Sequence, residues 1–556
     1  MDPHYDPALL PHRPRNDDIP KTNYNTITTV NSSAESKSID GEQFDGTAKL
    51  AKEGAIILIP SPGQDPRDPL NLPVWHKNFI MFILTLYSVS GLTVVVGLGA
   101  LLVYFIPVYQ KAGKSTAQIS ALLTYPNLFL GVGNLFSMPL VLAVGRRPVF
   151  LVSNLLLFFS CIMCATNRNF EWHLAARCLA ALSGAQCEAL VPLIIQDIFF
   201  LHQRARVLQY WSSSQTIANS TLVIISSYMT NAVGWRAWYW LFTATSGLAL
   251  VLTIFFVPES AYDRPISAFM GTAPQEFAPT GDSDAPLAAD NIHEPITTLD
   301  ERKLNTVNYA PRTLRSDMRV FVTPHDWPKT FITLKHITQL LVLPHILWLA
   351  LMNGFFLAID ISISITYGPI LVAPPYNWAK TSVSIAQVGQ LPVAFIAMPL
   401  LGWLSDFIVT KMAKRNGGRH EPEYRLLTLV FPLLLLLMLT AIYGAAAENP
   451  YGYHWMAIIF PQNVWLFLLF ATNTVGITYL LDSHPKRAGP VLVIMCLMRG
   501  LVSFGVSYHT VDYVDAVGYV RLFGIYAGLM AVFGVLGIGV FVWGKKIRHW
   551  VMRWTN

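Results

Sequence analysis

Charged side chains are scarce in this sequence. Asp, Glu, Lys and Arg make up 13% of the 556 residues, whereas soluble domains carry about 25%. Apolar residues make up 53% of the chain and aromatic residues 12%. This composition excludes an ordinary soluble domain and predicts a protein that crosses a membrane several times.

Cysteine is also rare, and none of it lies in a polar loop. The five cysteines, Cys161, Cys164, Cys178, Cys187 and Cys496, all fall within apolar blocks, which predicts no disulfide framework. Cys161 and Cys164 form one Cys-x-x-Cys pair without a second pair, and the histidines are dispersed. We therefore expect no metal site and no cofactor.

Motifs of several other protein classes are missing as well. The sequence has no G-x-x-x-x-G-K-[S/T] loop, so ATP is not expected to bind. No nucleophile, base and oxyanion-binding group stand together, so no enzyme is expected. The formal net charge is +6, but Lys and Arg recur in short clusters between apolar blocks. Such spacing is typical of membrane topology rather than of nucleic-acid binding.

Long apolar runs dominate what is present. The first residues, MDPHYDPALLPHRP, lack the apolar core of a signal peptide, so we expect the first spanning helix to direct membrane insertion. Twelve runs suited to crossing about 30 Å of hydrocarbon as a helix follow, at 78–106, 121–142, 149–166, 173–197, 211–232, 236–257, 341–371, 382–405, 424–443, 454–480, 489–509 and 520–543. The expected fold is an all-α membrane protein with twelve transmembrane helices in two pseudo-symmetric six-helix bundles.

Polar segments divide the chain into five parts. We expect a disordered N-terminal tail at 1–75, a first six-helix bundle at 76–258, a central loop at 259–338, a second six-helix bundle at 339–544 and a C-terminal tail at 545–556. The central segment is too long for a connection inside a compact bundle.

Basic residues in the short loops predict the orientation. The loops after the second, fourth, eighth and tenth runs, with the C-terminal tail, carry fifteen Lys and Arg, and the opposite loops carry six. The positive-inside rule therefore places both termini and the central loop in the cytoplasm.

The two halves resemble each other weakly. GRRP at 145–148 follows the second run, and GWLSD at 402–406 with a basic cluster follows the eighth. Repeated halves joined by a long linker are typical of alternating-access transporters, whose solute site lies between the halves near mid-membrane.

The fourth run carries charges into the bilayer. On a regular helix Arg177, Gly184 and Glu188 fall within about 20° of one line, with the two charges about 16 Å apart. Such charges cost about 2.5–3.5 kcal/mol on insertion scales, so they usually face a cavity or a partner. We expect one wall of a polar path. The alternative is that Arg177 extends to the outer interface and a neutral Glu188 makes a structural hydrogen bond.

Ordered motifs along 75–550 resemble the major facilitator superfamily, in particular its fungal drug:proton antiporter-like branch with twelve helices. They are DPLNLPVWHKN at 68–78, PLVLAVGRRPVFL at 139–151, GWRAWYW at 234–240, VPES at 257–260, GWLSDFIV at 402–409 and YLLDS at 479–483, together with Arg177, Gly184, Glu188, Asp197 and Arg499. The resemblance implies a secondary active transporter.

The sequence departs from the pattern of that family in two places. Met138 and Leu142 replace the first glycine and the acid that are usual in the loop after the second helix, whereas Gly402 and Asp406 retain them in the second half. The segment 218–229, ANSTLVIISSYM, has no Gly or Pro where antiporters carry a glycine- and proline-rich motif. These departures leave the direction of transport open.

Charged residues near the loops are the candidate gate. Arg146 and Arg147 stand where a guanidinium group can pair with a carboxylate or cap a helix end in one state only. The resemblance implies conformational contacts there and at Asp197, Asp406 and Asp482. We expect these contacts to break and re-form between two conformations; the alternative is a solvated positive face.

Few ionisable residues lie within the apolar runs. They include Arg177 and Glu188 in the fourth, Asp360 in the seventh and Arg499 in the eleventh. Burial favours the protonated form of a carboxylic acid, which lets it load and release a proton near neutral pH. We expect Glu188 or Asp360 to couple protons to transport, with Arg499 or Arg177 as partner. The alternative for Asp360 and Arg499 is a static ion pair.

Together these features predict a monomeric, proton-coupled carrier in a fungal plasma membrane that exports a small organic molecule, either a xenobiotic or a secondary metabolite. One alternative is a proton-coupled importer of a nutrient or of a cation such as a polyamine, favoured by the segment 218–229 and by the acids of the fourth and seventh runs. The other is a non-transporting membrane sensor whose polar segments bind partners. The expected partners of a carrier are the lipid bilayer, protons and the small-molecule substrate, and no nucleic acid.

Overall fold

The computed structural model describes residues 51–52, 55–56, 60–63, 65–262, 264, 311–322, 325–415, 421–483 and 487–555. The chain divides into two units, Met1–Ile56 and Ile57–Asn556. In the first unit, β1 (Ala51–Lys52) and β2 (Ala55–Ile56) pair in antiparallel fashion. Residues 1–50 of the predicted tail and 265–310 of the predicted central loop lie outside the described residues.

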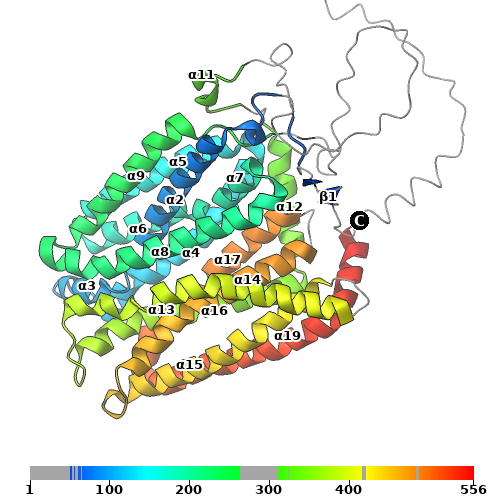
Figure 1. Ribbon diagram of the computed structural model, residues 1–556. Coiled ribbons are helices and arrows are strands. Elements are labelled where there is room, and N and C mark those ends of the chain that lie inside the picture. The colour runs from blue at the N-terminus through cyan, green and yellow to red at the C-terminus, as the bar shows by residue number, and fades with distance from the viewer. Residues whose placement is uncertain are drawn as a thin grey trace, which may run out of the picture. The chain divides into compact units, whose positions relative to one another are not determined.

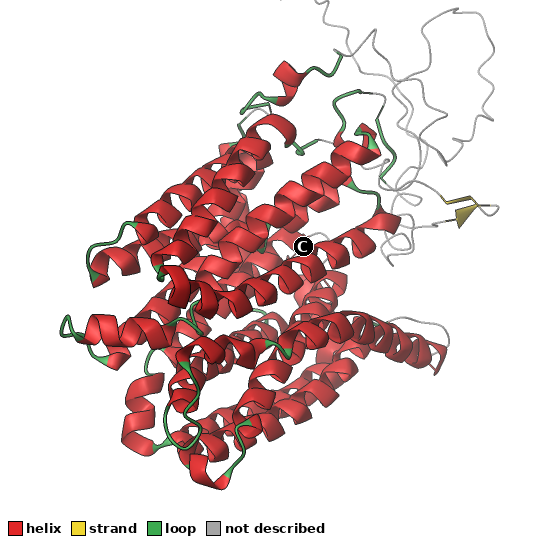
Figure 2. Cartoon of the chain, turned by 60° about the vertical axis from the view of Figure 1, so that its left-hand side comes forward, coloured by secondary structure: helices red, strands yellow, loops and turns green. Residues whose placement is uncertain are grey.

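The described part of the second unit is built from helices (Figure 1, Figure 2). Its first half contains η1 (Pro69–Asn71), α2 (Val74–Val96), α3 (Leu102–Gln110), α4 (Thr116–Val144), α5 (Arg146–Ala165), α6 (Phe170–Gly184), η2 (Ala185–Cys187), α7 (Leu190–Ile198), α8 (Leu201–Val233) and α9 (Arg236–Phe256). Two helices between the halves are α11 (Leu314–Asp317) and α12 (Trp327–Leu341). The second half contains α13 (Pro344–Val372), η3 (Lys380–Gln387), α14 (Gln390–Arg415), η4 (Pro422–Leu429), α15 (Val430–Glu448), η5 (Pro450–Gly452), α16 (Met456–Ser483), α17 (Ala488–Ser507), α18 (Thr510–Val517) and α19 (Tyr519–Thr555).

Ten helical segments in the described ranges are long and apolar enough to cross a membrane. They coincide with ten of the twelve predicted runs, so the all-α membrane fold is confirmed. The other two runs coincide with α8 and α14, which are less apolar because Ser, Thr, Asn and basic residues interrupt them. Membrane crossing by these two helices stays a prediction.

Each half buries its own hydrophobic core, and a few residues cross between the cores. Ile361 and Ile365 of α13 pack into the core of the first half. Val103, Met138 and Ala189 pack into the core of the second. The halves meet where α4 lies along α17 and where α8 lies against η3 and α14 (Figure 1). Any solute path between the halves is therefore bordered by these helices.

Four of the predicted runs are not single regular helices, because the eighth begins in η3 and the ninth in η4 before their α-helices, and two further runs are broken. The first run is broken between α2 and α3, and the fourth between α6 and α7, where η2 intervenes. The predicted stripe of Arg177, Gly184 and Glu188 is therefore wrong, because it assumed one regular helix. A break frees backbone carbonyl groups that need other donors, and it changes the direction in which Glu188 projects.

Three predicted boundaries also need correction. The predicted central loop contains most of α12, whose buried Thr333, Ile337 and Leu340 follow helical spacing and pack toward α4 and α17. The Pro-rich composition of the surrounding segment concealed this helix. Residues 60–63 and 65–73, assigned to the disordered tail, include η1 and the buried Asp68. The predicted C-terminal tail continues α19 as far as Thr555.

Candidate functional site

An ion pair joins the two halves inside the predicted membrane spans. Glu188 follows η2 at the break between α6 and α7, and its Oε1 pairs with Nη2 of Arg499 on α17. The two side chains are 15% and 13% exposed. The second carboxylate oxygen of Glu188 is buried without a hydrogen-bond partner. Of the partners expected for Arg499, the structure selects Glu188 and not Asp360, so the static pair of Asp360 with Arg499 is wrong.

Backbones of the two halves come very close beside this pair. A Cβ atom placed on Gly500 of α17 would lie 2.7 Å from the Asn127 carbonyl oxygen and 2.8 Å from Cα of Gly131 on α4. Only glycine allows such an approach without displacing one of the helices. The contact between α4 and α17 therefore depends on Gly131 and Gly500.

Arg177 is a structural cation and does not line a path with Glu188. Arg177 is 1% exposed. It donates to the carbonyl oxygens of Val94 and Val95 at the end of α2, at 2.9 and 2.8 Å, and to Leu122 of α4 at 2.8 Å. These carbonyl groups lie next to the helix break, so Arg177 caps the end of α2 and ties it to α4. It neither extends to an outer interface nor pairs with a carboxylate.

A chain of hydrogen bonds leads from Arg177 toward the end of α6 that carries His173. Arg177 donates to the Tyr239 hydroxyl at 3.4 Å, and the two ring nitrogens of His173 bond to Tyr239 and Tyr109 at 2.8 Å each. No pattern in the sequence predicted a role for His173, Tyr239 or Tyr109. Their signal was weak, because a single histidine at a helix end and two tyrosines on other helices share no spacing in sequence. Because each ring nitrogen already has a hydroxyl partner, the imidazole serves as a buried structural linker.

Asp360 differs from the other predicted site residues because, among the described residues, it has neither a hydrogen bond nor an ion pair. It lies on α13 and is partly buried. Polar side chains flank it along α13: Asn353 donates to Asn473 of α16 at 2.7 Å, and Ser364 accepts from Gln462 of α16 at 3.5 Å. An unpaired carboxylate in such a place is costly, which makes Asp360 a candidate functional group.

Arg146, Arg147 and Asp197 meet at the end of the first half where α5 begins, which we call the basic end. Arg146 Nε bonds to Asp197 Oδ2 at 3.1 Å, and Arg147 Nη2 donates to the Ile254 carbonyl near the end of α9 at 2.7 Å. Both expected geometries, a carboxylate pair and a helix cap, are therefore present. All these contacts lie within the first half. The side chains of Asp406 and Asp482 lie outside the described residues.

Three further residues belong to the basic end, although the sequence did not single them out: Asp68, Glu259 and Arg264. Glu259 accepts the backbone N–H groups of Arg146 and Arg147 at 3.0 and 3.1 Å, so it caps α5. Asp68, which is fully buried, pairs with Arg264 at 2.8 Å and also accepts from two backbone N–H groups. The motifs DPLNLPVWHKN and VPES contained Asp68 and Glu259, but their distance in sequence gave no sign that their segments meet at one end.

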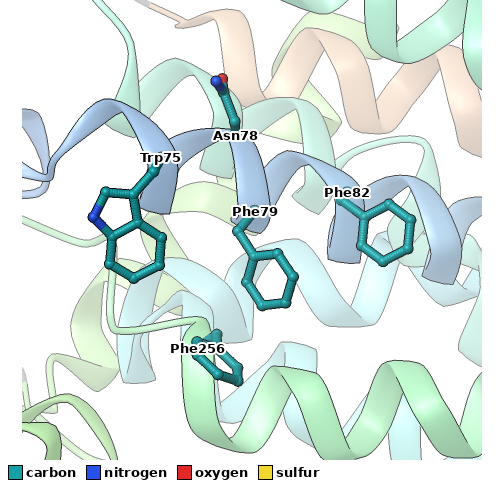
Figure 3. A pocket seen from close by; sticks show the side chains of 5 residues that line it. All are labelled: Trp75, Asn78, Phe79, Phe82 and Phe256. Carbon is teal, nitrogen blue, oxygen red and sulfur yellow. The ribbon is translucent and has the colours of Figure 1, made fainter.

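A groove lined by aromatic rings lies on the surface of the first half (Figure 3). Trp75, Phe79 and Phe82 of α2 face Phe256 of α9, and Asn78 points away from the rings. The Phe79 and Phe256 rings meet edge to face at 4.8 Å. Trp75 and Phe82 are more than half exposed. An apolar, exposed surface on a spanning helix is suited to contact with lipid, so this groove is separate from the charged residues between the halves.

Comparison with known proteins agrees with this architecture. The sequence profile described as Major Facilitator Superfamily matches residues 79–491. The chain is 23% identical to an MFS-type transporter of Schizosaccharomyces pombe, covering 91% of this chain and 90% of the relative. It is 24% identical to the protein HOL1 of Saccharomyces cerevisiae, covering 91% and 93%, and 21% identical to the MFS antiporter QDR3 of Candida albicans, covering 95% and 86%.

The family match covers well over half of the chain, and the relatives cover 91–95% of it, while ten segments of the described residues are long and apolar enough to span a membrane. The protein is therefore an integral membrane transporter and not an enzyme. The chain belongs to the major facilitator superfamily.

Proposed function

We propose that this protein is a monomeric, proton-coupled transporter that exports a small organic molecule, a xenobiotic or a secondary metabolite, across a fungal plasma membrane by alternating access. In this proposal the basic end and both termini face the cytoplasm, as the distribution of Lys and Arg in the loops favours. The observation that carries it is the pair of Glu188 and Arg499 between the two halves.

Glu188 suits the role of a proton-coupled contact because of where it lies. Alternating access requires the halves to move against each other, so contacts between them must weaken at some point of the cycle. A proton that binds Glu188 removes its negative charge and turns a charge-assisted hydrogen bond with Arg499 into a weaker one. Protonation therefore lowers the free energy of separating α17 from the break between α6 and α7.

Asp360 is the second carboxylate in this proposal. It lies on α13, which packs closely along α17, the helix that carries Arg499. Because no cation neutralises Asp360 among the described residues, its charge is balanced only when a proton or a positively charged solute binds. Competition between the two at Asp360 is a direct means of exchanging a solute for a proton.

The contacts at the basic end support the same cycle in another way. Arg146 with Asp197, and Glu259 with the start of α5, connect α5, α7 and the segment after α9. We propose that these contacts form a gate that breaks and re-forms between the two conformations, in step with movement at the Glu188 pair. Asp406 and Asp482 are proposed to play the corresponding part in the second half.

The test is a flux measurement with purified protein in proteoliposomes, screened by counterflow over dyes and fungal metabolites and repeated with imposed pH jumps. Accumulation of a solute against an opposing proton gradient supports proton-coupled export. Uptake that runs with the proton gradient would support an importer instead, and flux without any response to pH would exclude proton coupling.

Two variants test the carboxylates in the same assay. Glu188→Gln and Asp360→Asn are each expected to lower flux and to flatten its dependence on pH. A matched control is Asp512→Asn, because Asp512 is 59% exposed and, among the described residues, pairs with His509, three positions away. Coupling through these acids is wrong if both variants keep the flux and the pH dependence of the unmodified protein.

A further inference from the structure

Polar side chains of α13 and α16 face each other along one line, which we call the α13–α16 seam and define by Asn353, Asp360, Ser364, Gln462 and Asn473. Asn353 bonds to Asn473, and Ser364 bonds to Gln462. The two residues on each helix are eleven positions apart, about three full turns, so each pair lies on one helix face. The two hydrogen bonds therefore fix the antiparallel register of the helices.

Asp360 lies on the same face of α13, between the two hydrogen bonds. It follows Asn353 by seven positions and precedes Ser364 by four, and both spacings bring side chains to one side of a helix. In the register set by the hydrogen bonds, the apolar Leu466 is the residue of α16 opposite Asp360. The partner helix thus offers no donor to the carboxylate at this level.

Several acceptor atoms of the seam lack a donor in the part of the chain that the structure describes. The Asn353 and Gln462 amide nitrogens donate to Asn473 and Ser364, whereas their carbonyl oxygens, Asn353 Oδ1 and Gln462 Oε1, are buried without a hydrogen bond. The two residues are 1% and 2% exposed. Together with the two carboxylate oxygens of Asp360, these two amide oxygens make four acceptor atoms of the seam without a donor among the described residues.

Buried acceptors without donors are uncommon in proteins, because each one loses its hydrogen bond to water on burial. Here they recur over about three turns of two helices, next to an unpaired negative charge. The missing partner must therefore supply several N–H or O–H donors and a positive charge. A proton on Asp360 supplies one donor only, which leaves at least one amide oxygen unpaired.

We propose that the α13–α16 seam binds a primary ammonium group of the transported solute. This proposal rests on the proposed transport function and names the chemical class of its substrate. An ammonium group has three N–H donors and no acceptor, and its charge is balanced by Asp360. The Phe356 and Trp465 rings, whose centroids are 6.2 Å apart, are buried in the core of the second half, and Phe356 lies one turn before Asp360 on α13.

The experiment compares amines that share charge and carbon skeleton but differ in N–H groups. Full-length protein in lipid nanodiscs is titrated calorimetrically with phenethylammonium and with its N,N,N-trimethyl analogue at neutral pH, where both are cations. We expect the trimethyl compound to bind about 10- to 100-fold more weakly, because charge-assisted hydrogen bonds to the seam are lost. Equal binding of the two compounds would overturn the proposal, since it would show that charge alone is recognised.

Variants locate the site. Asp360→Asn is expected to weaken phenethylammonium binding by about 10- to 100-fold, and Asn353→Leu or Gln462→Leu to reduce the advantage of the primary amine over the trimethyl analogue. Asp512→Asn is the matched control and leaves both affinities unchanged. Unchanged affinities in all three seam variants would place the amine elsewhere. If Asp360→Asn does not fold, the difference in affinity between the two amines on unmodified protein still tests the proposal.

Failure of this proposal is distinguishable from failure of the proposed function. A primary ammonium site at the seam is excluded if methylammonium, butylammonium and phenethylammonium all fail to bind. In that case, pH-driven flux of another solute in proteoliposomes would still support proton-coupled transport. Absence of any solute or proton flux would exclude the transport proposal independently of amine binding.

Discussion

The two halves of this protein treat their charged groups differently. In the first half Arg146, Arg147, Arg177 and Arg264 each donate to acceptors of that same half. In the second half Asp360 has no partner among the described residues.

This difference separates structural charges from functional ones. A cation whose donors are used by backbone carbonyls, such as Arg177, stabilises the fold and has little left for a solute. An acid without hydrogen-bond donors, such as Asp360, lowers the stability of the fold, and such a residue usually marks a site that binds a proton or a ligand. The Glu188–Arg499 pair belongs to neither group, because its charges are paired but come from different halves.

The largest effect on stability is expected from Arg177. Arg177→Leu removes three hydrogen bonds to backbone carbonyls at the end of α2 and in α4, and should destabilise the protein by about 2–4 kcal/mol. The measurement is thermal unfolding in detergent, with Arg168→Leu as control because Arg168 is exposed. An unchanged unfolding temperature for Arg177→Leu would contradict a structural role.

Exchange of charges tests the contact between the halves. Glu188→Arg alone places two cations together inside the membrane spans and should lower the initial flux rate about 10- to 100-fold. Combination with Arg499→Glu restores opposite charges and should recover part of the flux. A double variant no better than the single one would argue that the two residues act separately.

The buried pair of Asp68 and Arg264 is expected to contribute less. Asp68→Asn weakens an ion pair whose side chains are 0% and 6% exposed, and should lower the free energy of unfolding by about 1.5–3 kcal/mol. Lys114→Gln is the control, because the pair of Lys114 with Glu171 is solvent-exposed and should not affect the unfolding temperature measurably. Equal effects of both substitutions would remove the distinction between buried and surface pairs.

The smallest effect is expected where the halves touch through glycines. Gly500→Ala adds one methyl group at 2.7 Å from the Asn127 carbonyl oxygen and should destabilise the α4–α17 contact by about 1–2 kcal/mol, seen as a change in flux rate. Gly505→Ala on the same helix meets nothing within 4 Å and serves as control. If both variants transport alike, the close approach at Gly500 has no part in the cycle.

The sequence predicted the fold well because a bilayer restricts the possible structures. Runs of about twenty apolar residues can only be helices there, and ten of the twelve predicted runs satisfy the length and apolarity of a span. α12 was missed because the composition of a whole polar segment conceals one short helix. The break at η2 was missed because helical periodicity carries no information about where a helix stops being regular.

The candidate site was predicted only in part. The sequence identified Glu188, Arg499, Asp360 and Arg177 as rare charges inside apolar runs, but it did not determine their partners. Partner choice depends on which helices are neighbours, and α17 lies beside α4 and the broken helix of the first half. The hydrogen bonds of Asn353 and Gln462 were equally hidden, since their partners are more than ninety residues away.

The sequence by itself therefore determined the membrane location, the helical fold, the two halves and the short set of charges worth examining, because these follow from local hydrophobicity and from the cost of burying charge. Only the tertiary structure decided that Arg177 holds helix ends, that Glu188 reaches Arg499 and that Asp360 stands among unpaired acceptors. The physical reason is that hydrogen bonds and ion pairs require atoms within about 3 Å, and that proximity arises only when distant segments of the chain pack together.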